Sequence, residues 1–506
     1  MTRTSTRLLE LLELRRSILL DIDSDQRLLV GNDDSGSSQL YEVSPDGGWR
    51  QLTDLGEPCT GRYLPGERVV VVSADTGGTE RTQLSLLRLD PAGAAEDRAA
   101  DRPGDLEPVV HDPAFLHDLL DVQPDRLIYA TNRRNGVDFD IVSRTLSTGA
   151  EQVLWDGGGW FSDARVSPDG RWVVLSRLTL LPASSQLLLV EAGSGRAEEI
   201  TDPAVPGEWS GARWLPDSTG LLAASDAGTE FVSLRHFELA GRQWSEVARA
   251  DDADVFGWPA PDGRRLAVLT TRDGADELVV HDWAGGRLDT GQPVRFPHPG
   301  VLTFHSEPVW ALDSSMLGLT FCSPVQPPEV YSWRDGSTAE RRTTSNPAAA
   351  TDGLVEPRPA RVPTPDGEQI PVLVLAPPEP DGSAVLMIHG GPEGASVRSW
   401  NPMAAALTLA GHTVVLPNVR GSTGYGRRWL SMDDVEKRLD SVADLVAVRD
   451  WLPTLGVDTG RVALYGGSYG GYMVLAGLTF HPELWAAGVD IVGISSLVSF
   501  LQNTSA

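Results

Sequence analysis

The amino-acid sequence predicts a seven-bladed β-propeller followed by an α/β-hydrolase domain with a doubly wound, mostly parallel sheet. Two observations carry this prediction. A unit of turn, aliphatic run and alternating strand recurs seven times in the first two thirds of the chain. The last third alternates apolar strands with helical segments around a Gly-x-Ser-x-Gly sequence. A chain of 506 residues is also long enough for two or more domains.

The composition indicates a globular, acidic protein. Hydrophobic residues make up 41% of the chain, charged residues make up 22%, and the formal net charge is −28. This charge argues against nucleic acid or an anionic membrane as a partner, because both would require basic patches. The two cysteines, Cys59 and Cys322, cannot form a disulfide framework in so large a chain, which favours a cytoplasmic location. We find no motif for a metal or a cofactor and expect neither.

Residues 1–19 show apolar spacing of three and four, which predicts an amphipathic helix. Glu10, Glu13 and Arg15 interrupt its leucines too early for a signal peptide or a membrane span. We therefore expect this helix to pack on another part of the protein.

Residues 20–345 contain the repeat that predicts the propeller. Each copy begins with a short turn, usually Pro-Asp-Gly or a relative, and continues with a β-branched or aliphatic run. The seven turns are Ser24-Asp25, Pro65-Gly66, Pro124-Asp125, Pro168-Asp169-Gly170, Pro216-Asp217, Pro261-Asp262-Gly263 and Leu312-Asp313. Most copies start roughly 45 residues after the previous one, a period typical of propeller blades. A β-sandwich with recurrent hairpins is the alternative, but seven copies in phase favour a propeller.

Residues 346–360 form a predicted linker, because proline is frequent and aromatic residues are rare there. Residues 361–506 form the predicted hydrolase domain. We expect strands at 369–375, 384–388, 413–416, 462–465 and 487–492, and helices at 399–410 and 435–452. Apolar strands that alternate with helices predict a sheet covered on both faces.

The segment from Arg461 to Phe480 organises this domain. An apolar run breaks into Gly466-Gly467-Ser468-Tyr469-Gly470-Gly471 and then resumes as an apolar segment of helical length. A strand, a sharp turn and a helix in this order would expose the hydroxyl of Ser468 and place it beside the helix N-terminus. The pattern therefore predicts Ser468 as a nucleophile, although a Gly-rich loop before a buried helix is the simpler alternative.

A second motif, His389-Gly390-Gly391-Pro392, follows the predicted strand at 384–388. Glycines at the end of a strand leave main-chain N–H groups open, and such a loop supplies one oxyanion donor in hydrolases of this fold. The residue after the nucleophile, Tyr469, would supply the other donor. His389 is disfavoured as the general base, because the acid–base histidine of this fold follows the serine in the chain. Residues 418–426, NVRGSTGYG, are either an ordered loop over the sheet edge or a plain connection.

The three motifs HGGP, NVRGSTGYG and YGGSYGGY, in this order behind a seven-fold β repeat, resemble the prolyl oligopeptidase family of serine peptidases. The resemblance is to its acylaminoacyl-peptidase-like and dipeptidyl-peptidase-like branch. It implies a propeller that caps the active site and admits short peptides, with Ser468 as nucleophile. It also implies the main-chain amides of Tyr469, Gly391 and Gly390 as the oxyanion hole. A tyrosine stands at the position of His389 in some relatives, so a contribution of its side chain to that hole stays open.

The sequence departs from this family after Ser468. The resemblance implies a catalytic aspartate and histidine well beyond the elbow, whereas only 38 residues follow Ser468. His481 is the sole histidine among them, at the expected far end of the helix that begins at the nucleophile, and Asp490 lies in or beside the next strand. We therefore expect the catalytic Asp and His to be absent, the hydrolase domain to be incomplete, and the chain to be an inactive fragment or a prematurely ended reading frame.

Three functions are consistent with the sequence. The first is a serine-type peptidase that hydrolyses short peptides through an acyl-enzyme at Ser468, with exopeptidase-like acylaminoacyl or dipeptidyl release. The second is a non-catalytic protein whose propeller binds peptides or partners beside a remnant hydrolase domain. The third is a small-ester hydrolase, because the elbow and the oxyanion loop suit either acyl group. Specificity and oligomeric state do not follow from the residues.

Overall fold

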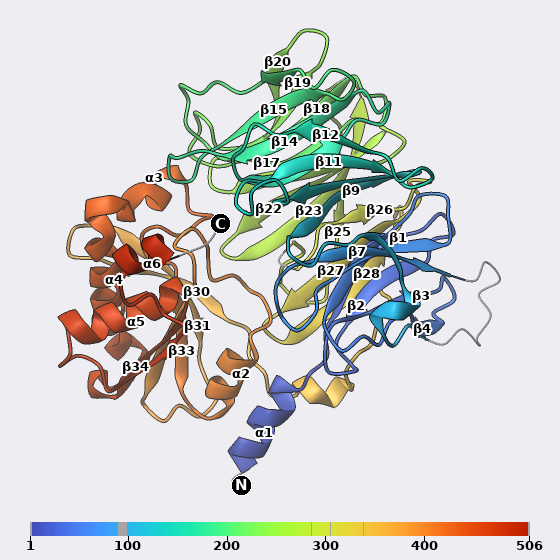
Figure 1. Ribbon diagram of the computed structural model, residues 1–506. Helices are drawn as coiled ribbons and strands as arrows, with labels where there is room; N and C mark the ends of the chain where they lie inside the picture. Colours follow the sequence, from blue (N-terminus) through green and yellow to red (C-terminus); the bar gives the residue numbers. More distant parts are fainter. Residues whose placement is uncertain (1–2, 90–98, 285, 304, 337, 504–506) are drawn as a thin grey trace.

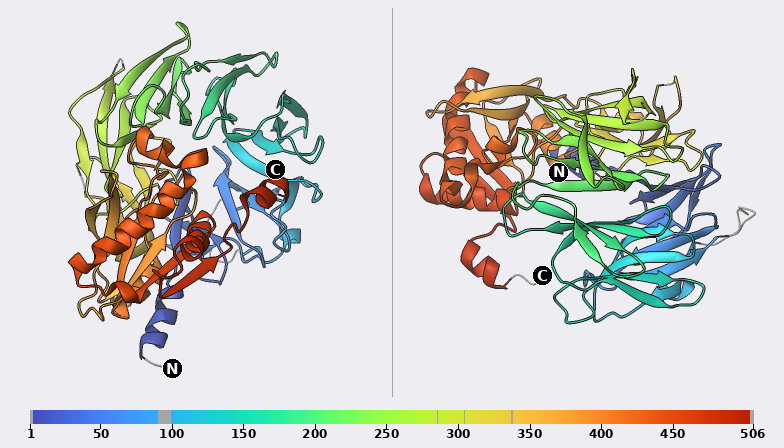
Figure 2. Two further views of the ribbon diagram at one scale, coloured as in Figure 1. Left: turned by 90° about the vertical axis from the view of Figure 1, so that its left-hand side faces the viewer. Right: turned by 90° about the horizontal axis from the view of Figure 1, so that it is seen from above.

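The computed structural model describes residues 3–89, 99–284, 286–303, 305–336 and 338–503. The strands β1 to β29 form one domain and the elements from β30 onward form the other (Figure 1). The hydrolase domain, orange to red, lies against one side of the propeller in the two further views (Figure 2). The predicted seven-bladed propeller and the hydrolase-type sheet are both confirmed.

Each propeller blade consists of consecutive antiparallel strands. The first three blades contain β1 (Ser17–Ile22), β2 (Leu28–Asn32), β3 (Gln39–Val43) and β4 (Trp49–Gln51); β5 (Cys59–Tyr63), β6 (Val69–Ala74), β7 (Gln83–Arg88) and β8 (Glu107–Val110); and β9 (His117–Gln123), β10 (Arg126–Thr131), β11 (Asp140–Thr145) and β12 (Glu151–Trp155). Blades four and five contain β13 (Phe161–Val166), β14 (Trp172–Leu178), β15 (Ser185–Glu191) and β16 (Ala197–Glu199); and β17 (Trp209–Trp214), β18 (Gly220–Ser225), β19 (Ser233–Glu238) and β20 (Gln243–Ala248).

The last two blades complete the ring. They contain β21 (Asp254–Pro259), β22 (Arg265–Arg272), β23 (Ala275–Ala284), β24 (Arg287–Leu288) and β25 (Gln292–Val294); and β26 (Val309–Trp310), β27 (Leu317–Ser323), β28 (Gln326–Trp333) and β29 (Glu340–Arg341). All seven predicted turns lie between the first and second strands of a blade, so each predicted aliphatic run is a second strand. These second strands are largely buried, as in β18, where all six residues are buried. Their side chains pack between neighbouring blades and form the propeller core.

The turn between first and second strands is built alike in all seven blades. One residue of each turn has a positive φ, and the seven are Gln26, Gly66, Asp125, Gly170, Ser218, Gly263 and Ser314. Glycine adopts this conformation without strain, whereas another residue costs about 1 kcal/mol or more. The two serines among these seven residues bond across to the neighbouring blade. The hydroxyls of Ser218 and Ser314 accept hydrogen bonds from the main-chain N–H of Asp169 at 3.0 Å and of Asp262 at 2.9 Å.

The first strands line a central cavity of about 900 Å³, to which all seven blades contribute. Charged side chains enter it, and Glu307 of the seventh blade forms an ion pair with Arg213 of the fifth. Asp21 also lines it and accepts hydrogen bonds from the main-chain N–H groups of Ile22 and Tyr63, both at 2.8 Å. Burial raises the pKa of Asp21 to about 6.

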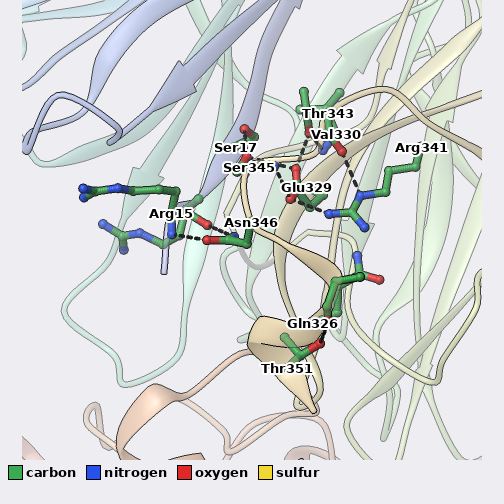
Figure 3. A network of polar contacts seen from close by, with 12 residues as sticks. Arg15, Ser17, Gln326, Glu329, Val330, Arg341, Thr343, Ser345, Asn346 and Thr351 are labelled. Carbon is green, nitrogen blue, oxygen red and sulfur yellow. Dashed lines mark hydrogen bonds and ion pairs between the residues drawn. The ribbon is translucent and has the colours of Figure 1, made fainter. Parts of the chain in front are cut away.

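The ring closes between the first and seventh blades without exchanging a strand, since each of these blades is built from its own stretch of chain. Glu329 of β28 lies at this seam and is 0% exposed (Figure 3). Its carboxylate accepts hydrogen bonds from Arg341 at 2.6 Å, from the hydroxyl of Thr343, and from the main-chain N–H of Ser345 at 2.8 Å. The hydroxyl of Ser345 in turn lies 2.7 Å from that of Ser17 at the start of β1.

A second contact at the seam joins the two ends of the propeller directly. The side chain of Asn346 bonds to both main-chain groups of Arg15, accepting from its N–H and donating to its carbonyl, each at 2.8 Å (Figure 3). Hydrophobic packing supports these polar contacts, because Leu19 and Val30 of the first blade contact Met316 and Val330 of the seventh.

The hydrolase domain contains a six-stranded sheet in the order β30-β31-β33-β32-β34-β35. The pairs β30–β31 and β31–β33 are antiparallel, and the pairs β33–β32, β32–β34 and β34–β35 are parallel. Its strands are β30 (Arg358–Pro363), β31 (Gln369–Leu375), β32 (Ala384–Ile388), β33 (Thr413–Pro417), β34 (Val462–Gly467) and β35 (Ala487–Ile491). Its helices are α2 (Pro402–Leu409), α3 (Arg427–Leu430), α4 (Arg438–Trp451), α5 (Tyr469–Phe480) and α6 (Leu497–Asn503). The first three residues of β30 fall within the range that we predict as linker.

The N-terminal helix α1 (Arg3–Leu12) packs on the hydrolase domain. Leu11 is 1% exposed and contacts Ala405 and Ala406 of α2. The guanidinium of Arg7 donates a hydrogen bond to the carbonyl of Ala350, in the segment that joins the two domains, at 2.8 Å. The helix is shorter than the range 1–19 that the sequence suggests, because β1 already begins at Ser17; residues 1 and 2 lie outside the described part.

Candidate active site

Ser468 lies at a sharp corner between β34 and α5. Its backbone has φ +55° and ψ −120°, a conformation that residues other than glycine rarely adopt, and its side chain is exposed. The main chain holds the corner from both sides: the N–H of Ser468 donates to the carbonyl of Ile491 at 2.9 Å, and its carbonyl accepts from Tyr472 at 3.0 Å. Strained backbone of this kind persists only where its surroundings fix it, and it is characteristic of functional sites.

Three of the glycines around Ser468 are required by close packing. A Cβ at Gly466 would lie 2.3 Å from the carbonyl oxygen of Gly470, and a Cβ at Gly470 would lie 2.3 Å from that of Ile388. A Cβ at Gly471 would lie 2.3 Å from a carboxylate oxygen of Asp490. The start of α5 therefore packs closely against the ends of β32 and β34. The side chain of Ser468 stands at the tip of the turn between them.

The loop after β32 lies next to this serine. A Cβ at Gly390 would lie 3.7 Å from the Cβ of Ser468, which measures how closely the two main chains approach. Within the described ranges, no acceptor receives a hydrogen bond from the main-chain N–H of Gly390, Gly391 or Tyr469. The structure thus brings the predicted nucleophile and the predicted oxyanion loop together, with N–H groups left open for a ligand.

His389 is engaged elsewhere. Its Nδ1 lies 2.8 Å from the carbonyl oxygen of Gly390, and its Nε2 lies 2.9 Å from the hydroxyl of Ser422. Ser422 is fully buried and donates to the carbonyl of Val419 at 2.6 Å. Burial lowers the pKa of His389, which favours the neutral imidazole with a single N–H. The Gly390 carbonyl and the Ser422 hydroxyl, whose hydrogen is donated to Val419, are both acceptors, so the neutral ring donates to one of them at a time. The ring therefore lies between the loop after β32 and the loop 418–426.

The two downstream candidates lie in different places. His481 follows the last residue of α5, so the 12 residues of this helix separate it from Ser468, about 18 Å by helical rise. Asp490 is in β35, and its carboxylate accepts a hydrogen bond from the main-chain N–H of Gly493 at 2.9 Å. In the part of the chain that the structure describes, no imidazole forms a hydrogen bond with the hydroxyl of Ser468.

The loop 418–426 is ordered and buried at its root. Arg420 is 6% exposed and forms a two-pronged ion pair with Asp444 of α4, at 2.8 and 3.0 Å. Asn418 is fully buried and donates a hydrogen bond to the hydroxyl of Tyr425 at 2.8 Å. These contacts fix a loop that sequence reasoning left open between an ordered element and a plain connection.

The propeller reaches the site through two contacts that the sequence did not reveal. Arg427, just after this loop, forms an ion pair with Asp226 of the fifth blade at 2.9 Å. Glu393, three residues after Gly390, accepts a hydrogen bond from the main-chain N–H of Ala183 in the fourth blade at 3.2 Å. Because these residues are more than 200 positions apart in the chain, no local pattern could have paired them.

Among the described residues, no group of three or more His, Cys, Asp or Glu is arranged to hold a metal ion. No described helix is both long enough and apolar enough to cross a membrane.

The fold and the corner at Ser468 define a class of protein: a β-propeller joined to an α/β-hydrolase domain with a nucleophile elbow. Solved structures share this architecture. The puromycin-hydrolyzing peptidase of Mycobacterium tuberculosis superposes with a TM-score of 0.80 over 98% of this chain and 80% of that chain, at 18% identity. A prolyl endopeptidase structure gives the same TM-score over 98% of this chain and 75% of that one, at 17% identity.

Part of the chain, residues 397–506, matches the model of the prolyl oligopeptidase family. The dipeptidyl aminopeptidase BIII of Pseudoxanthomonas mexicana is 32% identical over 457 residues, which are 85% of this chain and 62% of the relative. The acylamino-acid-releasing enzyme of Rattus norvegicus is 31% identical over 484 residues, 89% of this chain and 56% of the relative. The chain thus spans less than two thirds of the length of these relatives.

Proposed function

We propose that this protein is a serine peptidase that hydrolyses short peptides through an acyl-enzyme at Ser468. The observation that carries the proposal is the strained corner at Ser468, which exposes one hydroxyl beside a loop with open N–H groups. Such a pair suits attack on a carbonyl carbon, followed by stabilisation of the negative oxygen that forms. We assign the oxyanion donors to the main-chain amides of Tyr469, Gly391 and Gly390.

Exopeptidase action is the finer part of the proposal. Two relatives are named for it: one is a dipeptidyl aminopeptidase and the other an acylamino-acid-releasing enzyme. The propeller supports a preference for short substrates, because its loops touch the oxyanion loop at Glu393 and the segment after the loop 418–426 at Arg427. A folded protein would have to displace these contacts to reach Ser468.

The proton acceptor is left unassigned. His389 has the Gly390 carbonyl and the Ser422 hydroxyl beside its two ring nitrogens, and His481 lies beyond the far end of α5. A serine without a base is a weak nucleophile, and its rate falls by several orders of magnitude even where the oxyanion hole is intact. We therefore propose that the 506-residue chain, assayed alone, turns over slowly; rapid turnover would contradict this part.

The experiment that tests the proposal is covalent labelling with a fluorophosphonate, followed by peptide mapping, applied to this chain and to any longer product of the same gene. We expect the label on Ser468, its loss in Ser468→Ala, and no change in the matched control Ser431→Ala, an exposed serine at a helix end. Labelling elsewhere, or none in either form, would refute the proposal and favour a non-catalytic peptide-binding protein.

Substrate assays separate the peptidase from a small-ester hydrolase. We expect chromogenic di- and tripeptide amides, with and without an N-terminal acetyl group, to be cleaved with higher kcat/KM than p-nitrophenyl acetate relative to their uncatalysed rates. An esterase would show the opposite order, because its site would gain nothing from the peptide portion.

We also propose a cytoplasmic location. Both cysteines, Cys59 and Cys322, are free and buried, and burial raises the pKa of each thiol, which keeps them unreactive. Cell fractionation tests this, and recovery from an extracytoplasmic fraction would contradict it.

A further inference from the structure

The side chain of Tyr469, the residue directly after the nucleophile, is enclosed by polar groups. Tyr469 is 3% exposed, and its hydroxyl donates a hydrogen bond to Asp433 at 3.1 Å and accepts one from Arg438, also at 3.1 Å. The guanidinium of Arg438 also lies over the tyrosine ring, 5.3 Å from its centroid. Ser441 Oγ lies 3.3 Å from the same hydroxyl.

The two charged residues are themselves fixed. Asp433 is 2% exposed and forms an ion pair with Arg438, the first residue of α4. Its carboxyl group fits where Gly421 has no side chain: a Cβ at Gly421, whose φ is +95°, would lie 2.3 Å from the carboxyl carbon. Asp433, Arg438 and Tyr469 therefore join the loop 418–426, the start of α4 and the start of α5 in one buried cluster.

This cluster has a geometric consequence for the catalytic corner. A buried tyrosine held through its hydroxyl cannot turn about its own backbone, so the peptide unit between Ser468 and Tyr469 is fixed from the side-chain end. The ring of Tyr469 also stacks on Tyr472, at 5.5 Å between centroids, in the first turn of α5. A residue with a strained backbone, such as Ser468, keeps its conformation only where several surrounding contacts fix it, and these contacts do so.

We infer that Asp433 and Arg438 are positioning residues that hold the Tyr469 side chain and thereby aim the Tyr469 N–H at the oxyanion. We call the contacts of Asp433 and Arg438 with the Tyr469 hydroxyl the clamp. The catalytic consequence of the clamp rests on the proposed function, but the clamp itself is a property of the fold. An oxyanion donor contributes roughly 100- to 1000-fold to kcat, and an error of about 1 Å in position costs roughly 100-fold. Loosening the clamp should therefore lower kcat and leave substrate binding nearly unchanged.

The kinetic test compares Asp433→Asn, Tyr469→Phe and the double variant in the form of the protein that turns over peptides. Tyr469→Phe keeps the ring and the main-chain amide and removes only the hydroxyl that the clamp holds. We expect kcat to fall roughly 10- to 100-fold in each single variant with KM within about threefold. The double variant should be no slower than the slower single variant, because both changes release the same contact.

Asp434→Asn, the adjacent carboxylate with no side-chain hydrogen bond among the described residues, is the matched control. Unchanged kcat, or losses that multiply in the double variant, would overturn the inference.

Amide hydrogen exchange tests the clamp without relying on activity. We expect residues 465–473 to exchange at least about tenfold faster in Asp433→Asn than in Asp434→Asn, with the propeller strands unchanged. Equal exchange in the two variants would overturn the inference even if the protein proves to be an enzyme. A wild-type protein that fails to label Ser468 would instead refute the proposed function, and the exchange result would still decide the clamp.

Discussion

Replacing Glu329 by alanine should weaken the seam that closes the propeller. The buried carboxylate accepts four hydrogen bonds, from Arg341, the Thr343 hydroxyl, and the N–H and hydroxyl of Ser345. Alanine would leave these donors without this acceptor; the Thr343 hydroxyl is buried, whereas the Arg341 side chain is 37% exposed and can turn to water. Breaking a fully buried charge pair from one side typically costs about 3–5 kcal/mol, and we expect about 3 kcal/mol because one partner is partly exposed. Glutamine should cost less, because one of its two polar atoms can still accept.

Differential scanning calorimetry and hydrogen exchange measure this effect. A loss of this size should lower the unfolding temperature of the propeller by roughly 4 °C. Exchange should rise in β1 and β28, on the two sides of the seam, before it rises in the middle blades. The control is Glu340→Ala, an exposed residue of the same blade. If Glu329→Ala unfolds within about 1 kcal/mol of that control, the carboxylate does not hold the ring closed and the reasoning fails.

Three further predictions concern single contacts. Ser314→Ala keeps the strained backbone and loses the hydrogen bond to Asp262, so it should lower the free energy of unfolding by about 1–2 kcal/mol. Ser314→Gly loses the same hydrogen bond but relieves the backbone strain, so it should lower the free energy of unfolding less. The reverse order in urea unfolding would contradict this. Leu11→Ala should weaken the packing of α1 on the hydrolase domain by about 2–4 kcal/mol. The loss should appear as faster proteolysis near residue 12. Unchanged cleavage would argue that Leu11 does not anchor the helix. The carboxyl of Asp21 has a pKa of about 6 in the folded state and about 4 in the unfolded state. Because the folded state holds this proton more tightly, the free energy of unfolding should fall as the pH rises from 4 to 6, by up to about 3 kcal/mol. Asp21→Asn should flatten that dependence in unfolding series at pH 4.5 and 6.5; identical slopes would refute it.

The second strands of the propeller were predictable because they are buried on both sides and read as unbroken aliphatic runs. The first strands were not, because they face the central cavity and mix charged residues such as Arg62 and Arg165 with apolar ones. Strand β30 was missed for a related reason. It lies at the edge of the sheet and contains Pro359 and Pro363, so it has the composition of a linker.

The corner at Ser468 was predictable because the chemistry of an elbow dictates its residues locally. A sharp turn between a strand and a helix requires glycines at fixed offsets, and these appear in the sequence. The partners of the site were not predictable in the same way. Ser422 meets His389 across 33 residues, and Arg438 meets Tyr469 across 31, so only the tertiary fold shows that these side chains are neighbours.

The pairing of Arg15 with Asn346 means that the chain enters and leaves the propeller at one point of its circumference. Every covalent tether to the hydrolase domain, and the N-terminal helix that grips it, therefore issues from that point. Once the contacts of Arg427 and Glu393 with the fifth and fourth blades had broken, a pulling force between the two halves would be delivered to the junction of the first and last blades. The strength of that junction sets how far the halves can be drawn apart before the circle itself opens.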